Sequence, residues 1–167
     1  MGFYFAFQVV FQDIYFMDQK LFKLKFQRDY FELNSDYDKL SDIEKQKISS
    51  LDIKSSFEHE GDDSVYYLYL LTNVTHMEIY KKILDDNLIP YLCKDISKEI
   101  INGDINLEKI LEPYLDHSNH LKYDGFIFDI NKWIYQSLDL DSILDRILTN
   151  GMSSLRSIEK EYLENYK

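Results

Sequence analysis

Histidines and carboxylates are the side chains of this sequence that could carry chemistry. His117 and His120 stand three residues apart in the segment DHSNH, with Asp116 beside them. Two imidazoles at this spacing can share a metal ion on a helix face, but a zinc site needs at least a third ligand, and no CxxC or HExxH pattern supplies one. Ser118 and Asn119 instead favour a loop after a helix, with ordinary solvated histidines.

The triplet Asp52, Ile53 and Lys54 has the spacing with which nucleases hold a metal-bound carboxylate beside a charge-stabilising amine. Asp36 or Asp38 could supply an upstream acid. The pattern is short, however, and arises easily by chance in a chain with 29% charged residues. An exposed lysine at the entry of a strand is the commoner explanation.

No longer catalytic motif is present. The sequence contains no GxSxG, no glycine-rich phosphate loop and no dinucleotide fingerprint. The turn EHEGDD offers oxygen ligands but lacks the alternating acids and the closing glutamate of an EF-hand loop. We therefore expect no cofactor, no metal ion and no catalytic residues. A small hydrolase or metal-dependent enzyme whose site is assembled only in the fold is the alternative.

The chain is strongly acidic and rich in aromatic residues. Its net charge is −11, from 30 Asp and Glu against 19 Lys and Arg, and it contains 14 Tyr and 11 Phe. AT-rich codons would explain many of the tyrosines, but they would also raise the lysine content, so they do not explain the acidity. An acidic domain repels phosphate backbones and anionic membrane surfaces and favours cationic partners. We therefore predict binding to neither nucleic acid nor membranes.

Clusters of carboxylates beside aromatic residues predict a surface for a basic protein partner. Carboxylates steer and hydrogen-bond lysine and arginine, and tyrosine supplies rigid contact area, as in tight protein inhibitors of basic enzymes. Further acidic clusters lie at 85–86 and 139–145, and an ordinary solvated acidic surface is the alternative. The residues predicted to bind the partner are Asp36, Tyr37, Asp38, Glu58, Glu60, Asp62 and Asp63.

Charge, size and missing motifs together favour a non-catalytic binding protein of a low-GC bacterium or its phage. The instance they favour most is an immunity protein or antitoxin that covers the active site of a cognate toxin such as a nuclease. A phage-encoded inhibitor of host defence and a subunit of a larger assembly are the alternatives that are not enzymes.

The length of 167 residues predicts one globular domain over 1–167, without linkers or repeats. Cys93, the only cysteine, cannot form an intramolecular disulfide, which favours a reducing compartment. The apolar start of the chain lacks a basic n-region and is interrupted by Gln8, Gln12 and Asp13, and no stretch reaches the roughly 18 apolar residues of a membrane span. We expect a soluble cytoplasmic protein.

The predicted fold is organised around the segment Phe57 to Leu84. From Val65 to Leu71 every residue is apolar or aromatic on both alternating sides, which predicts a central strand covered on both faces. Thr75 and Glu78 then form a capping box that opens a helix. This helix must end or kink before Pro90, because proline cannot continue the backbone hydrogen bonding.

The remaining patterns predict an α+β fold. Segment 28–40 is expected to be irregular. In the last helix, Leu155, Ile158, Tyr162 and Tyr166 are predicted to face inward and Glu159 outward. The predicted strands come first in the sequence and the predicted helices mostly follow them. This order predicts an antiparallel or mixed sheet of about 4–6 strands, with several helices packed on it, mostly from the C-terminal half. Alternation predicts strands over 3–17 and 21–27 as a hairpin, then over 53–60 and 125–129. Helical spacing predicts helices over 41–50, 75–89, 91–102, 107–115, 140–150 and from 153 onward.

Reversing Glu58, Glu60, Asp62 and Asp63 to lysine is expected to weaken binding of a basic partner and to leave the fold intact. The physical reason is that all four carboxylates lie in or just before a turn at the edge of the predicted sheet, where their charge can steer a cationic protein. The affinity of the purified variant for the product of the neighbouring gene checks this, with circular dichroism as the control for folding. Unchanged affinity would move the interface to another surface.

Overall fold

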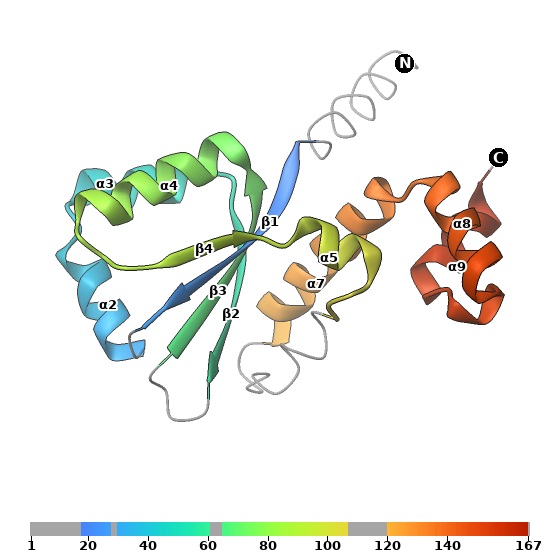
Figure 1. Ribbon diagram of the computed structural model, residues 1–167. Coiled ribbons are helices and arrows are strands. Elements are labelled where there is room, and N and C mark those ends of the chain that lie inside the picture. The colour runs from blue at the N-terminus through green and yellow to red at the C-terminus, as the bar shows by residue number, and fades with distance from the viewer. Residues whose placement is uncertain (1–17, 28–29, 61–64, 107–119, 167) are drawn as a thin grey trace, which may run out of the picture.

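The computed structural model describes residues 18–27, 30–60, 65–106 and 120–166. These ranges form a four-stranded antiparallel sheet with helices on both of its faces, and most helices lie in the C-terminal half of the sequence (Figure 1), which confirms the predicted α+β class. The strand order is β2-β3-β1-β4. The strands are β1 (Gln19–Phe26), β2 (Lys54–Glu60), β3 (Val65–Asn73) and β4 (Leu92–Asp95).

β1 and β3 form the centre of the sheet, as predicted for the 65–71 segment. The antiparallel register places Leu21 opposite Leu71 and Phe22 opposite Leu70. All four side chains are at most 8% exposed, and they belong to two separate hydrophobic clusters, one on each face of the sheet. The predicted hairpin partner over 3–17 lies outside the described residues.

One face of the sheet is covered by three helices, namely α2 (Tyr30–Lys39), α3 (Asp42–Ser50) and α4 (Val74–Asp86). Met77 and Leu84 of α4 pack with apolar residues of β1 in this cluster. The α3 helix begins with the predicted capping box, in which the Ser41 hydroxyl and the Glu44 carboxylate each bond the other residue's backbone N–H.

The opposite face is covered by α5 (Ser97–Asn102) and α7 (His120–Ser137). Ile130 and Trp133 of α7 pack with Leu21 and Leu71 of the sheet. The Trp133 indole N–H also donates to the backbone carbonyl of Gln19 at 3.1 Å, so this buried polar atom is satisfied. The sheet is therefore the middle layer between two layers of helices.

Two segments are helical where the sequence predicted otherwise. The predicted strand 125–129 lies inside α7, because Phe126, Ile130 and Trp133 recur at helical spacing and all face the core. The alternation within GFIFD was too short to exclude a helix. The predicted irregular segment 28–40 contains α2. Leu33 and Leu40 of this segment pack in the hydrophobic cluster on the face of the sheet that α2, α3 and α4 cover. In both segments, packing against the hydrophobic core determines the secondary structure.

The predicted helix 91–102 is instead the strand β4 followed by the helix α5. Cys93 of β4 lies opposite Leu24 of β1 in an antiparallel ladder, so long-range backbone pairing replaces a helix here. The helix α5 ends at Gly103, as predicted, with a left-handed backbone at φ +80°.

The α4 helix starts at Val74 and is capped by the Asn73 side chain, so the predicted Thr75 cap was wrong. The predicted helix 107–115 lies outside the described ranges.

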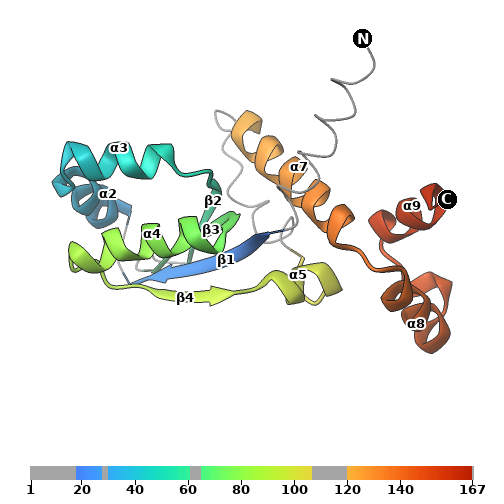
Figure 2. The same ribbon diagram turned by 90° about the horizontal axis from the view of Figure 1, so that it is seen from above.

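The C-terminal part comprises α8 (Leu140–Asn150), the short 3₁₀ helix η2 (Met152–Ser154) and α9 (Ser157–Asn165). In Figures 1 and 2, α8 and α9 lie at the end of the molecule opposite α2, α3 and α4. The observed bounds of α8 agree with the helix predicted over 140–150. Leu155 is buried as expected, whereas Tyr166, predicted to face inward, is 55% exposed.

Glu159 was predicted to face solvent, but its side chain is only 1% exposed. Arg146 of α8 lies 2.6 Å and Arg156 lies 2.9 Å from its carboxylate, so two guanidinium groups pair this buried charge. Arg156 also donates to the carbonyl oxygens of Ile100 and Ile101. This network of Glu159, Arg146 and Arg156 joins α8, α9 and α5.

The Glu159→Gln variant is expected to be less stable than the wild type at neutral pH by about 3 kcal/mol, because the two partly buried arginines lose their buried counter-charge. Burial by itself raises the pKa of Glu159, but the hydrogen bonds and charge of Arg156 and the charge of Arg146 outweigh it and hold the pKa below its ordinary value. The native state therefore keeps this carboxylate ionised at a pH where the unfolded chain protonates it.

The stability difference between wild type and Glu159→Gln should be largest at neutral pH and shrink as the pH falls below about 4.3, the pKa of a glutamate in the unfolded chain. Urea unfolding at a series of pH values measures it. The exposed Glu164 of the same helix supplies a matched control, since Glu164→Gln should change little. A difference that stays constant with pH would contradict this assignment.

Candidate partner-binding surface

The structure separates the residues that the sequence proposed for partner binding. Asp36, Tyr37 and Asp38 lie on α2, which packs on the face of the sheet that α3 and α4 also cover. Glu58 lies on β2 opposite Tyr67, on the face that α5 and α7 cover. The two groups therefore belong to different sides of the sheet and do not form one surface.

The other predicted residues lie at or beyond the end of β2. Glu60 is the last residue of this strand. Its side chain, together with Asp62 and Asp63, lies outside what the structure describes, so their part in partner binding stays a prediction.

The α2–α3 corner, which we define as Tyr37, Asp38, Asp42 and Ile43, presents aromatic, acidic and aliphatic side chains together. Tyr37 is 44% and Ile43 is 78% exposed, and both aspartates are exposed. The Lys45 ammonium lies 5.6 Å from the centre of the Tyr37 ring and donates to the Asp38 carbonyl at 2.9 Å, which fixes α3 against the end of α2.

Only half of this corner could be predicted from the sequence. Tyr37 and Asp38 were proposed because an aromatic residue stands between two acids. Ile43, with Ile48 and Leu51, indicated only that a short helix runs over 41–50. The exposure of Asp42 and Ile43 depends on how α3 packs on the rest of the chain, which no local pattern encodes.

A cavity of about 190 Å³ lies behind the corner, between α2, α4 and the sheet. Its lining is mostly apolar or aromatic and includes Leu33, Tyr37, Tyr66 and Leu84. An apolar cavity of about 150 Å³ is enough to hold a benzene-sized ring. Tyr80 also lines the cavity, and burial, together with nearby Tyr37, raises the pKa of its hydroxyl to about 12. This hydroxyl is therefore neutral at physiological pH.

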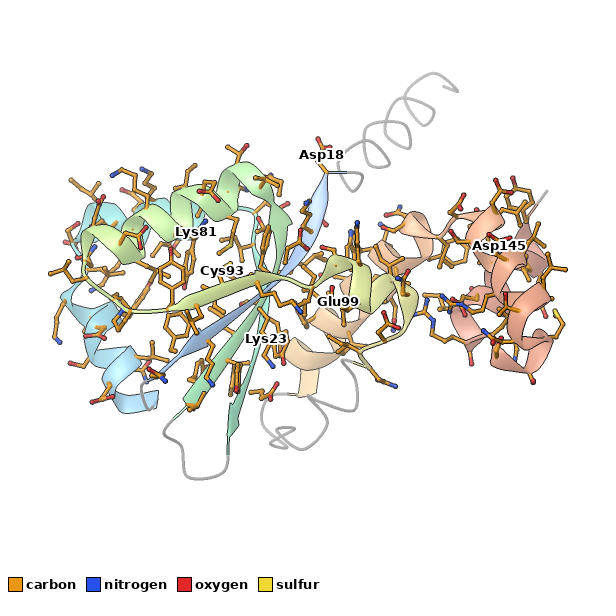
Figure 3. The ribbon with its side chains drawn as sticks, in the orientation of Figure 1. Asp18, Lys23, Lys81, Cys93, Glu99 and Asp145 are labelled. Carbon is orange, nitrogen blue, oxygen red and sulfur yellow. The ribbon has the colours of Figure 1, made fainter. Side chains whose placement is uncertain are left out.

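Glu58 has a structural role. Its carboxylate accepts a hydrogen bond from the hydroxyl of Tyr69, which is fully buried, and lies 3.8 Å from the ammonium of Lys23. Lys23, labelled on β1 in Figure 3, lies 3.9 Å from the centre of the Tyr67 ring. We therefore expect a change at Glu58 to cost stability, which makes this residue unsuitable for testing binding by charge reversal.

The residues considered for catalysis are spread over different elements. The Lys54 ammonium pairs with Asp129 of α7 at 3.4 Å. The Asp52 backbone N–H donates to His76 Nδ1 at 3.2 Å, and its carbonyl accepts from the Thr72 hydroxyl at 2.7 Å. The contacts of Asp52 are thus made by its backbone just before β2, whereas the Lys54 side chain pairs with α7. His117 lies outside the described residues.

Comparisons with known proteins supply no family or relative. The sequence matches no protein-family model, and neither the curated proteins nor the solved structures show a match to it. Over the described ranges, no group of three or more histidine, cysteine, aspartate or glutamate side chains could hold a metal ion. No helix in the part of the chain that the structure describes is long and apolar enough to cross a membrane.

The double variant Asp38→Lys with Asp42→Lys is expected to weaken binding of a basic partner at least about tenfold, because it replaces two attractive charges by two repulsive ones. Its free energy of unfolding should stay within about 0.5 kcal/mol of the wild type, because both side chains are exposed and the unfavourable lysine in the first turn of α3 is offset by the favourable lysine in the last turn of α2. Titration calorimetry with the partner and urea unfolding measure the two quantities.

The matched control reverses two exposed carboxylates elsewhere, Asp18→Lys with Asp104→Lys, and gives the same change in net charge. Equal loss of affinity in both double variants would show that net charge, and not the α2–α3 corner, governs binding.

Proposed function

We propose that this chain is a non-catalytic acidic protein that binds and neutralises a basic protein partner. In its most specific form, the proposal is a bacterial immunity protein or antitoxin that inhibits a cognate toxin such as a nuclease. The observation that carries it is the α2–α3 corner, which exposes aromatic, aliphatic and acidic side chains and whose Tyr37 also lines an apolar cavity, in a chain of net charge −11.

The corner has the composition of an energetic centre of a protein interface. Tyr37 and Ile43 offer apolar contact area, and the cavity behind Tyr37 can receive an apolar side chain of the partner. Asp38 and Asp42 are exposed, follow Tyr37 and precede Ile43 directly in the sequence, and can bond lysine or arginine. A central anchor with charges at its rim combines tight contact with fast, salt-sensitive association.

A nuclease is a suitable target for such a surface. Its active site binds phosphate groups and is therefore positively charged. The positive charge with which the nuclease binds its substrate would also bind the carboxylates of a protein that covers this site. Such a protein inhibits the nuclease by blocking the site and needs no catalytic activity of its own. The same acidity opposes binding of the inhibitor to nucleic acids or to anionic membranes.

The proposal places the protein in the cytoplasm, where a toxin would have to be neutralised before it acts. Cys93 is exposed on the edge strand β4. A reducing compartment would keep this thiol free, which supports a cytoplasmic location.

Coexpression with the product of the neighbouring gene tests the proposal. The chain should restore growth of a host that this product arrests, and it should suppress the product's nuclease activity when both purified proteins are mixed. The Asp38→Lys, Asp42→Lys variant should restore growth less well than the Asp18→Lys, Asp104→Lys control. A chain that purifies alone, binds no neighbour and fails to rescue growth would exclude this function.

A further inference from the structure

The helix α8 leaves half of its apolar face uncovered. In α4, Met77 and Leu84 are buried, but in α8 only Ile143 is, at 2% exposure. Two exposed leucines four residues apart on α8, together with the exposed Met152 just beyond the end of the helix at Gly151, form what we call the α8 apolar row. The row comprises Leu144 at 43%, Leu148 at 84% and Met152 at 56% exposure.

The other side of α8 holds it to the rest of the chain. Arg146 follows Leu144 by two positions, so at about 100° per residue it lies on roughly the opposite side of the helix. There it pairs with buried Glu159 of α9. This ion pair therefore joins α9 to the side of α8 that lies opposite Leu144 and Leu148.

An acidic row runs beside the apolar row. Asp141 and Asp145 are exposed and precede Leu144 and Leu148 by three positions, which places each pair on neighbouring parts of the helix surface. Neither aspartate forms an ion pair with another described residue. Figure 3 shows Asp145 on α8, at the end of the molecule away from the α2–α3 corner.

We propose that α8 is a docking surface for a basic amphipathic helix of the partner. The parallel rows repeat every four residues, or about 6 Å, which matches the spacing of side chains along a second helix. Leucine-like residues of that helix would cover Leu144, Leu148 and Met152, and its lysine or arginine residues would face Asp141 and Asp145. The inference rests on the proposed function in that the partner is basic.

A second copy of this chain fits the surface less well. It would bring the same two rows, and therefore an acidic edge rather than a basic one, to the contact. Like charges placed together at an interface weaken association. The chemistry of the surface thus selects a partner with the opposite charge pattern.

Peptide binding tests this proposal without the toxin. The probe is a synthetic peptide of about 18 residues, or five helical turns, with a leucine row beside a lysine row. Its counterpart carries glutamate in place of lysine. Fluorescence anisotropy should show binding of the lysine peptide to the wild type and at least tenfold weaker binding of the glutamate peptide.

Two variants of α8 locate the binding on the chain. Leu144→Ser with Leu148→Ser should weaken binding of the lysine peptide about tenfold, a loss of about 1.4 kcal/mol. Asp141→Asn with Asp145→Asn should weaken it and reduce its dependence on salt. The control Leu88→Ser with Leu92→Ser removes two leucines of similar exposure, at 86% and 68%, and should have no effect.

Unchanged binding in the Leu144→Ser, Leu148→Ser variant would overturn the proposal, and so would equal binding of the two peptides. A wild-type dimer that this variant dissociates would also overturn it, because the row would then bind a second copy. Failure of the growth rescue with intact peptide binding would instead remove the neutralising function and leave the docking surface standing.

Discussion

The fold depends on one constraint, which is that each of the two central strands carries buried apolar side chains on both faces of the sheet. Successive side chains of a strand point to opposite faces of the sheet, so large apolar residues at consecutive positions of β1 and β3 need cover on both faces. Helices α2, α3 and α4 supply it on one side, and α5 and α7 supply it on the other. The outer surfaces of these helices are then free to serve binding.

This arrangement explains where an interface can form. Polar residues of the sheet itself, such as Glu58 with Tyr69 and Lys23, take part in structural contacts. Outer helices carry two groups of side chains that combine exposure, charge and apolar area. They form two places at opposite ends of the molecule, namely the α2–α3 corner and the rows on α8, as Figures 1 and 3 show.

Local patterns in the sequence predicted those parts of the fold that local interactions decide. The 65–71 strand follows from seven consecutive apolar residues, and α3 follows from the Ser41 and Glu44 capping box. The strand β4 could not be found in this way, because its pairing with β1 joins residues about 70 positions apart in the sequence. Glu159 was placed outside because its neutralising partner Arg146 lies on another helix.

The candidate surface was partly predictable for the same reason. An aromatic residue between two acids is visible in the sequence at 36–38, and exposure of Tyr37 and Asp38 agrees with it. The role of Glu58 depends on the register that sets it opposite Tyr67, and the position of Ile43 depends on how α3 follows α2. Both depend on tertiary structure, which the periodicity of the sequence does not indicate.

The central claim is that this acidic protein binds a basic partner mainly through charge and a small apolar centre. The most direct measurement is the dissociation constant for the purified product of the neighbouring gene, determined by calorimetry at about 0.05 M and about 0.5 M salt, where screening differs strongly. The account predicts a one-to-one complex that weakens at least about tenfold at the higher salt concentration. Absence of a complex, or an affinity that does not change with salt, would contradict it.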